Sequence, residues 1–192
     1  MDHLLEFSRS GAQSAAAALE ALALPFLVFL ALGLAVKRGA LLSDMRRAFP
    51  QSLLKLQILV FNVVFVVPVI VLLSQWLHDL AAVWHLLLIG PASWVGWPPL
   101  AVVAVAILAG DFAGYWRHRF EHTPLLWPAH AVHHSDDEMT WLTLERFHPV
   151  NRITTFVLDN PALLLLGLPA YAIIANNLVR HYYGYLIHAD LP

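Results

Sequence analysis

The part of the sequence best suited to chemistry is a histidine-rich stretch, HRFEHTPLLWPAHAVHH, at residues 118–134. His118 and His122 are four residues apart, which places both rings on one face of a helix. His130, His133 and His134 repeat this pattern with spacings of three and four residues. Imidazole nitrogens bind zinc, iron and copper, and one zinc ion takes only about four ligands. Because five histidines exceed the ligand set of one ion, the stretch predicts a centre with two metal ions.

Other metal chemistries fit this stretch less well. In the zinc-protease pattern HExxH the glutamate follows the first histidine, whereas here Arg119 does, and Glu121 precedes His122. A carboxylate-bridged di-iron bundle would need Glu and Glu-x-x-His ligands inside helices, and these are missing. A haem bound by two histidines would use single residues on paired helices. The sequence has no cysteine, which excludes iron–sulfur clusters, thiolate-bound haem and cysteine zinc sites.

Further polar residues are candidates for roles around these histidines. Asp111 lies two helical turns before His118 on the same face, and we expect it to hold the second ring nitrogen of a ligand histidine. The alternative for Asp111 is a water-bonded residue near the helix end. His148, in the turn sequence ERFHP, could be a ligand. His78 and His85 are isolated at a predicted membrane interface, and we do not expect them to bind metal.

The composition indicates that these histidines belong to an integral membrane protein. The chain has 192 residues, of which 59% are hydrophobic and 12% are charged. Soluble domains carry about 25% charged residues, so this chain cannot cover itself with polar surface. The net charge of −2 gives no argument for nucleic-acid binding, and we expect no such partner. The N-terminus lacks the basic-then-apolar order of a cleaved signal, so the first apolar run is expected to be retained.

The elements that must position the histidines are apolar helices. A spanning helix needs about 20 apolar residues, and four blocks approach or exceed this length: 16–36, 53–73, 98–115 and 154–187. The fourth block is interrupted by Pro161, Gly167 and Pro169, so a bent hairpin suits it better than one straight helix. The fold class predicted is an all-α, polytopic membrane helical bundle, and the histidine-rich stretch begins where the third helix leaves the membrane.

The distribution of basic residues predicts the orientation in the membrane. The segment between the first two blocks and the segment after the third contain the basic residues Lys37, Arg38, Arg46, Arg47, Lys55, Arg117, Arg119, Arg146 and Arg152. Residues 74–97 contain no Lys or Arg and four tryptophans, which suit the opposite interface. We therefore expect the N-terminus outside and the histidine-rich metal site on the cytoplasmic side. The predicted division is 1–97 for the N-terminal helices and interfacial loop and 98–192 for the histidine domain.

Three segments together resemble a known family. They are DFAGYWRHRFEH, LLWPAHAVHHS and LTLERFHP, and YLIHADLP follows near the end. The sequence from about Leu100 onward is similar to the fatty acid hydroxylase/sterol desaturase superfamily of membrane histidine-box enzymes. By this resemblance, the pair at 118 and 122 matches the first box, and the three histidines at 130, 133 and 134 match the second. His188 matches the isolated third-region histidine and is a further expected ligand.

The resemblance implies an enzyme with two iron ions that uses O2 to hydroxylate, or to desaturate, a C–H bond of a lipid or sterol. It implies a site-lining role for His148. His181 lies about 10 Å along a helix from His188, so it could serve the second ion or neither. No flavin or nucleotide fingerprint is present, so a separate electron-transfer partner is expected. The membrane would be the inner membrane in a bacterium and the endoplasmic reticulum in a eukaryote.

One departure from the family pattern leaves other readings open. Members carry a final HxxHH box beyond the position of His188, whereas this sequence stops at Pro192. We therefore expect a C-terminally incomplete fragment with an incomplete site that is inactive alone. A non-catalytic membrane protein that handles metal, such as zinc, is one alternative. An inactive structural or regulatory relic of the family is the other.

Overall fold

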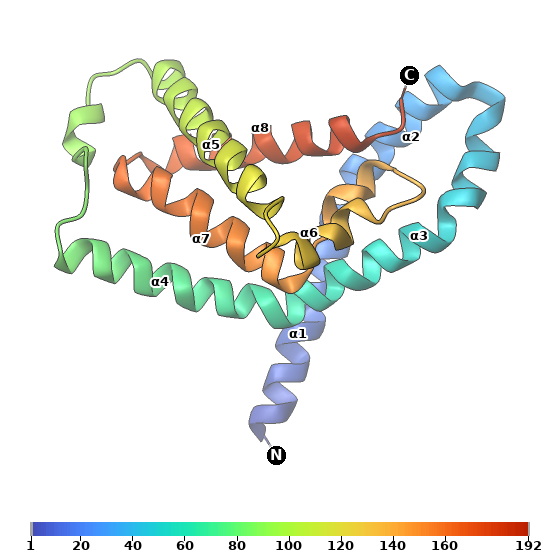
Figure 1. The fold of residues 1–192 in the computed structure, drawn as a ribbon, viewed down its shortest axis with the longest axis horizontal. Helices are drawn as coiled ribbons and strands as arrows, with labels where there is room; N and C mark the ends of the chain where they lie inside the picture. Colours follow the sequence, from blue (N-terminus) through green and yellow to red (C-terminus); the bar gives the residue numbers. More distant parts are fainter. Residues whose placement is uncertain (1, 192) are drawn as a thin grey trace. The chain divides into compact units, whose positions relative to one another are not determined.

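The computed structural model describes residues 2–191, with side chains from residue 6 onward apart from residue 7. Within this range the chain is helical and contains no strand, which confirms the all-α prediction (Figure 1). The longer helices are α1 (Asp2–Ala21), α2 (Ala23–Lys37), α3 (Leu41–Phe61), α4 (Val67–Val83), α5 (Pro99–Glu121), α6 (Trp127–His134), α7 (Pro149–Leu165) and α8 (Ala170–His188). The short turns are η1 (Arg38–Ala40), η2 (Asn62–Val66), η3 (Pro91–Trp94) and η4 (Trp141–Glu145).

The second predicted span is part of a longer helical stretch. Helix α3, the turn η2 and helix α4 follow one another without a break from Leu41 to Val83. The turn η2 is a π-helix, so it holds one more residue per turn than the helices on either side. Pro50 lies inside α3, where its missing N–H did not end the helix. The predicted limits of 53 and 73 were therefore too narrow.

The hairpin predicted for the fourth apolar block is confirmed. Helix α7 ends at Leu165 and α8 begins at Ala170, and the two run in opposite directions from the turn between them (Figure 1). Gly167 in this turn has φ +55°, which favours glycine, and a Cβ there would collide with the carbonyl oxygen of Ile89. Pro161, in contrast, lies inside α7 and does not mark the break.

Two helical stretches are long and apolar enough to cross a membrane by length and composition. They lie within Ser8–Val83 and Pro99–Glu121, so the first two predicted spans fall inside the first stretch and the third, 98–115, overlaps the second. Only 17% and 28% of their most apolar windows is buried, whereas the core helix of a soluble protein would be mostly buried. Apolar helices with exposed apolar surface are typical of membrane proteins. The number of spans and their orientation stay predictions.

The chain divides into two compact units. Unit 1 consists of Met1–Pro68, Ala131–Pro149 and Gly184–Pro192, and unit 2 of Val69–His130 and Val150–Tyr183. In unit 1, α1 packs against η2, and α3 packs against η4. Gly11 allows the first contact, because a Cβ there would lie 3.1 Å from Val64. The predicted domain boundary at residue 97 was drawn from sequence similarity and stays a prediction.

A buried lysine fixes the chain before η4 onto α3 in unit 1. Lys55 is 0% exposed, and its ammonium group pairs with Asp136 at 2.7 Å. It also donates to the carbonyl of Glu138 at 2.8 Å and to the hydroxyl of Thr140 at 3.2 Å. A buried cation is tolerated only when it is paired in this way. Lys55 therefore stabilises the packing of α3. It does not count among the loop charges that indicate orientation in the membrane.

Unit 2 is held by the close approach of α5 and α8. The core consists of Val102, Ala106, Leu163, Leu168 and Ala172. A Cβ added at Gly110 would collide with Asn176, and one at Gly114 would collide with Arg180, so both glycines leave room for side chains of α8. The end of α7 is tied to η3, because the indole of Trp94 donates to the carbonyl of Leu166 at 2.9 Å.

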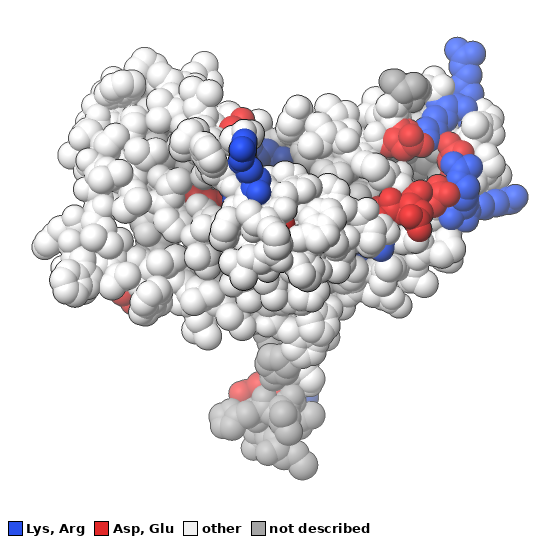
Figure 2. Space-filling view, in the orientation of Figure 1, with Lys and Arg blue, Asp and Glu red and all other residues white. Residues whose placement is uncertain are grey.

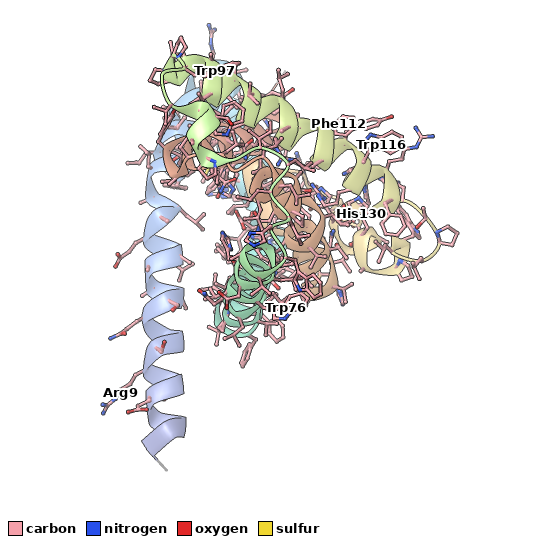
Figure 3. The ribbon with its side chains drawn as sticks, turned by 90° about the vertical axis from the view of Figure 1, so that its left-hand side faces the viewer. Arg9, Trp76, Trp97, Phe112, Trp116 and His130 are labelled. Atoms are coloured by element: carbon pink, nitrogen blue, oxygen red, sulfur yellow. The ribbon has the colours of Figure 1, made fainter. Side chains whose placement is uncertain are left out.

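Charged side chains are sparse on the molecular surface. Figure 2 shows a largely uncharged face on which acidic and basic groups gather near the α2–α3 turn. Phe112 and Trp116 project outward from α5 and are 68% and 52% exposed (Figure 3). These features fit surfaces that contact lipid, with aromatic rings suited to the interface.

Candidate metal centre

The C-terminal end of α5 brings the first two histidines together. His118 lies in the last turn of the helix and His122 caps it, with the N–H of His122 donating to the carbonyl of His118 at 3.3 Å. Their ring centroids are 4.8 Å apart, and their Nε2 atoms are 3.1 Å apart. Two ring nitrogens bound to one ion at about 2.1 Å are separated by roughly 3.0–3.4 Å. The pair therefore has the spacing that a shared metal ion requires.

A tight turn then places a third histidine in the same group. The hydroxyl of Thr123 donates to the carbonyl of Phe120 at 2.7 Å, and α6 starts four residues after Thr123, at Trp127. His130 on α6 has its ring 4.8 Å from that of His118 and 4.9 Å from that of His122. One ligand nitrogen of each of these three histidines lies within 4.8 Å of the others. The turn therefore brings His130 back against the first pair.

Pro128 does not interrupt helix α6. Pro128 is the second residue of α6, in the first turn, where a helix does not need its N–H. The same helix continues through His133 and His134. His134 thus stands one turn beyond His130 on α6, and its side chain is exposed.

Buried polar groups fix the orientation of the His130 ring. His130 is 1% exposed, and its Nδ1 lies 3.2 Å from Oδ1 of Asn151. The amide nitrogen of Asn151 donates to the carboxylate of Glu121, so the amide oxygen must face His130. An oxygen at this position requires Nδ1 of His130 to carry the proton, which leaves Nε2 with a lone pair for a metal. Burial also lowers the pKa of His130, which favours the neutral form that binds metal.

Glu121 is the functional residue that the sequence reading missed. Its carboxylate is 1% exposed and accepts hydrogen bonds from Arg117 at 2.6 Å and from Thr154 at 3.1 Å, in addition to the one from Asn151. Nδ1 of His130 lies 3.5 Å from it. The sequence does contain a sign of this contact, because Arg117 and Glu121 are four residues apart on one helix and can form an ion pair.

Asp111 forms an ion pair with an arginine of α8. Its side chain is 63% exposed, and its carboxylate pairs with Arg180 at 3.3 Å. Arg180 also contacts Asp159, which accepts a hydrogen bond from Arg117 at 3.0 Å. Asp111 therefore lies at the far end of an ion-pair chain that leads to Glu121. The residues beside His130 are Asn151 and Glu121, and a direct role of Asp111 beside a histidine stays a prediction.

Unit 1 contains a second group of histidines. Nε2 of His133 lies 3.1 Å from Nε2 of His188, and the ring of His134 is centred 5.4 Å from that of His133. Nδ1 of His188 lies 2.6 Å from the carbonyl of Gly184, which makes Nδ1 the donor and leaves the lone pair on Nε2. His133 is 8% exposed and stacks on Phe147, with ring centroids 5.0 Å apart. This pair repeats the Nε2 separation seen in unit 2, with its two rings at 74° to each other where those of His118 and His122 are at 44°.

The remaining histidines lie in other surroundings. His148 is half-buried immediately before α7, and His181 is exposed on α8 with its ring edge-on to Tyr182. Their expected roles at the site stay predictions. His78 lies on α4, 2.8 Å from the carbonyl of Ser74, and His85 lies just beyond α4 with φ +49°. The structure gives neither of them a place in the two histidine groups.

Both histidine groups lie in a segment that is similar to known proteins. Residues 103–192 match the family model described as fatty acid hydroxylase. The chain is also similar to ornithine lipid hydroxylase OlsE of Rhizobium tropici, with 30% identity over 96 residues. That match covers 50% of this chain and 29% of the relative, so the chain spans less than a third of it. No solved structure matches the chain. Residues 103–192, the part of the chain that matches the fatty acid hydroxylase family model, contain every histidine of the two groups.

Proposed function

We propose that this chain is part of a membrane lipid hydroxylase whose histidines hold two iron ions. One observation carries the proposal: each unit presents a pair of imidazole Nε2 atoms 3.1 Å apart. In each unit a hydrogen bond at Nδ1 of one histidine, His130 or His188, directs the lone pair of its Nε2 toward the other ring nitrogens. Nitrogen ligands of this kind suit iron.

The proposed ligands are three histidines from α5 and α6 and three near the second pair. They are His118, His122 and His130 in unit 2, and His133, His134 and His188 in unit 1. Iron in such a site would supply the activation of O2 for oxidation of a C–H bond. Burial favours the neutral form of His130 by lowering its pKa, and the network around Glu121 keeps the proton of His130 on Nδ1. Hydroxylation is favoured by the name of the relative, and desaturation is the alternative chemistry.

The substrate class is a lipid that enters from the bilayer. Apolar, exposed helices and the outward aromatic side chains of α5 support a site beside lipid. The relative is an ornithine lipid hydroxylase, which favours a polar lipid over a sterol. We further propose that the histidines face the cytoplasm, on the basis of the basic residues after α2 and around α6, and that a separate electron-transfer protein supplies reducing equivalents.

Metal content tests this proposal. The chain would be purified in detergent, loaded with ferrous iron under anaerobic conditions, and measured by mass spectrometry for metal per chain. We expect iron to bind and His118→Ala to remove it, with His85→Ala as a matched control that retains it. Lipid extracts from cells that express the chain would be searched for products heavier by one oxygen atom. Tight zinc in place of iron, with no oxidised lipid, would support a non-catalytic metal-handling protein.

A further inference from the structure

Unit 1 contains an apolar cavity that is separate from the histidines. Its volume is about 520 Å³, within the range of about 300–1,000 Å³ that is usual for small-molecule sites. The walls come from α1, α2, α3 and the segment around η4, with apolar side chains such as Phe26, Leu30 and Leu56. Phe29 and Trp141 form part of the lining and stack with ring centroids 5.8 Å apart. A cavity of this lining would take a hydrocarbon chain.

The cavity has charged residues in its lining that are joined to one another. Lys37 pairs with Asp44 at 2.9 Å and with Asp190 at 2.5 Å. Arg47 pairs with the same Asp44 at 3.1 Å and with Glu138 at 2.9 Å. All five line the cavity, so its charges form one continuous group, which we call the ionic rim. Figure 2 shows acidic and basic side chains gathered together on the surface near the α2–α3 turn.

The ionic rim carries more negative than positive charge. It contains two cations and three carboxylates, so one negative charge is in excess. Asp190 is 63% exposed and has one ion pair, with Lys37, although a carboxylate offers about four acceptor positions. Among the residues whose side chains are described, the carboxylate of Glu138 pairs with Arg47 alone. Both carboxylates can therefore accept hydrogen bonds from a further cation.

We infer that this cavity binds an amphiphile whose zwitterionic head group includes a protonated amine. The hydrocarbon chain would lie along the apolar walls, the anionic part of the head group would meet Lys37 and Arg47, and the amine would meet Asp190 and Glu138. Residues 189–191 line the cavity and directly follow His188, a member of the second histidine group. The cavity and that group are therefore adjacent along the chain. The statement that this amphiphile is the substrate rests on the proposed function. Its binding to the cavity requires neither metal nor O2.

Lipid binding to the metal-free chain tests the inference. The probes are dioctanoyl phosphatidylethanolamine, which has the amine, and dioctanoyl phosphatidylglycerol, which has the same chains and phosphate but no amine. Native mass spectrometry at neutral pH and low salt would give the apparent dissociation constant of each. We expect the amine lipid to bind about fivefold more tightly, since an exposed ion pair contributes at most about 1 kcal/mol.

Two variants and one control test which carboxylates cause the preference for the amine lipid. Glu138→Gln and Asp190→Asn should each reduce the preference for the amine lipid, and their combination should abolish it. Asp137→Asn is the control, because Asp137 is exposed and adjacent in sequence but does not line the cavity. Equal or tighter binding of phosphatidylglycerol, or the same loss in the control, would overturn the inference. Because the assay contains no iron, failure here leaves the hydroxylase proposal standing, and absence of iron binding leaves this one standing.

Discussion

Replacing Glu121 by glutamine should destabilise the protein and weaken metal binding at the same time. The carboxylate is buried and accepts hydrogen bonds from three side chains, Asn151, Thr154 and Arg117, the last at 2.6 Å. Neutralising one partner of a buried ion pair costs about 3–5 kcal/mol. Arg117 keeps its ion pair with Asp159 at 3.0 Å, so we expect the free energy of unfolding to fall by the lower of these values, about 3 kcal/mol. For a chain of this length, that loss lowers Tm by about 6–12 °C.

The effect on metal binding follows from the direction of hydrogen bonding. The carboxylate only accepts, which forces the amide of Asn151 to present its oxygen to His130. A glutamine at position 121 can donate, so Asn151 can reverse and present its NH2 group instead. His130 would then accept at Nδ1 and carry its proton on Nε2, the atom that a metal needs. We expect iron affinity to fall about 10–100-fold, the usual effect of losing such a partner.

Differential scanning fluorimetry of the detergent-purified variant, with and without ferrous iron, measures both effects. Glu20→Gln is the matched control, because Glu20 is an exposed glutamate on α1. An Arg117→Met and Glu121→Gln double variant would show how much of the loss belongs to the pair itself. The reasoning is refuted if Glu121→Gln has the melting temperature and the iron affinity of the control.

Two further substitutions test the second histidine group and the packing of unit 2. His133→Ala should remove iron from the chain, whereas His78→Ala should retain it. The measurement is metal per chain after anaerobic loading. Full iron content in His133→Ala would exclude that histidine as a ligand. Gly110→Ala should destabilise by about 1–3 kcal/mol, because the added methyl group collides with buried Asn176 and overpacks the α5–α8 contact. Gly39→Ala is its control, since a Cβ there meets nothing within 4 Å, and equal thermal stability of the two variants would contradict the packing argument.

The sequence was informative where a local rule decides the structure. Histidines four residues apart at a helix end share a face regardless of the rest of the fold, so the contact of His118 with His122 was predictable. The turn between α7 and α8 was predictable too, because Gly167 and Pro169 both disfavour a continuing helix.

The rest of the candidate site depends on contacts between distant residues. Asn151 reaches His130 across 21 positions, and Arg180 reaches Asp159 across the same number. No periodicity encodes such pairings, so the ion pair of Asp111 with Arg180 and the contacts of Glu121 with Asn151 were not predicted. The full length of the α3–α4 stretch was also not predicted, because the apolar block at 53–73 marks only part of it.

The π-turn at residues 62–66 has a consequence for aligning this protein with its relatives. A chain that lacks one residue there could form an ordinary α-helix across the same stretch, with every hydrogen bond of the ladder retained. One turn of π-helix takes up one residue more than a turn of α-helix, so such a deletion leaves the face of every later residue unchanged. An alignment without a gap is then out of step by one residue, which is a rotation of about 100°. Asn62, whose amide donates to the carbonyl of Phe147 at 2.8 Å, stands at the start of this segment. An alignment of α4 that forbids a gap at 62–66 would therefore compare lipid-facing positions of one protein with packed positions of another.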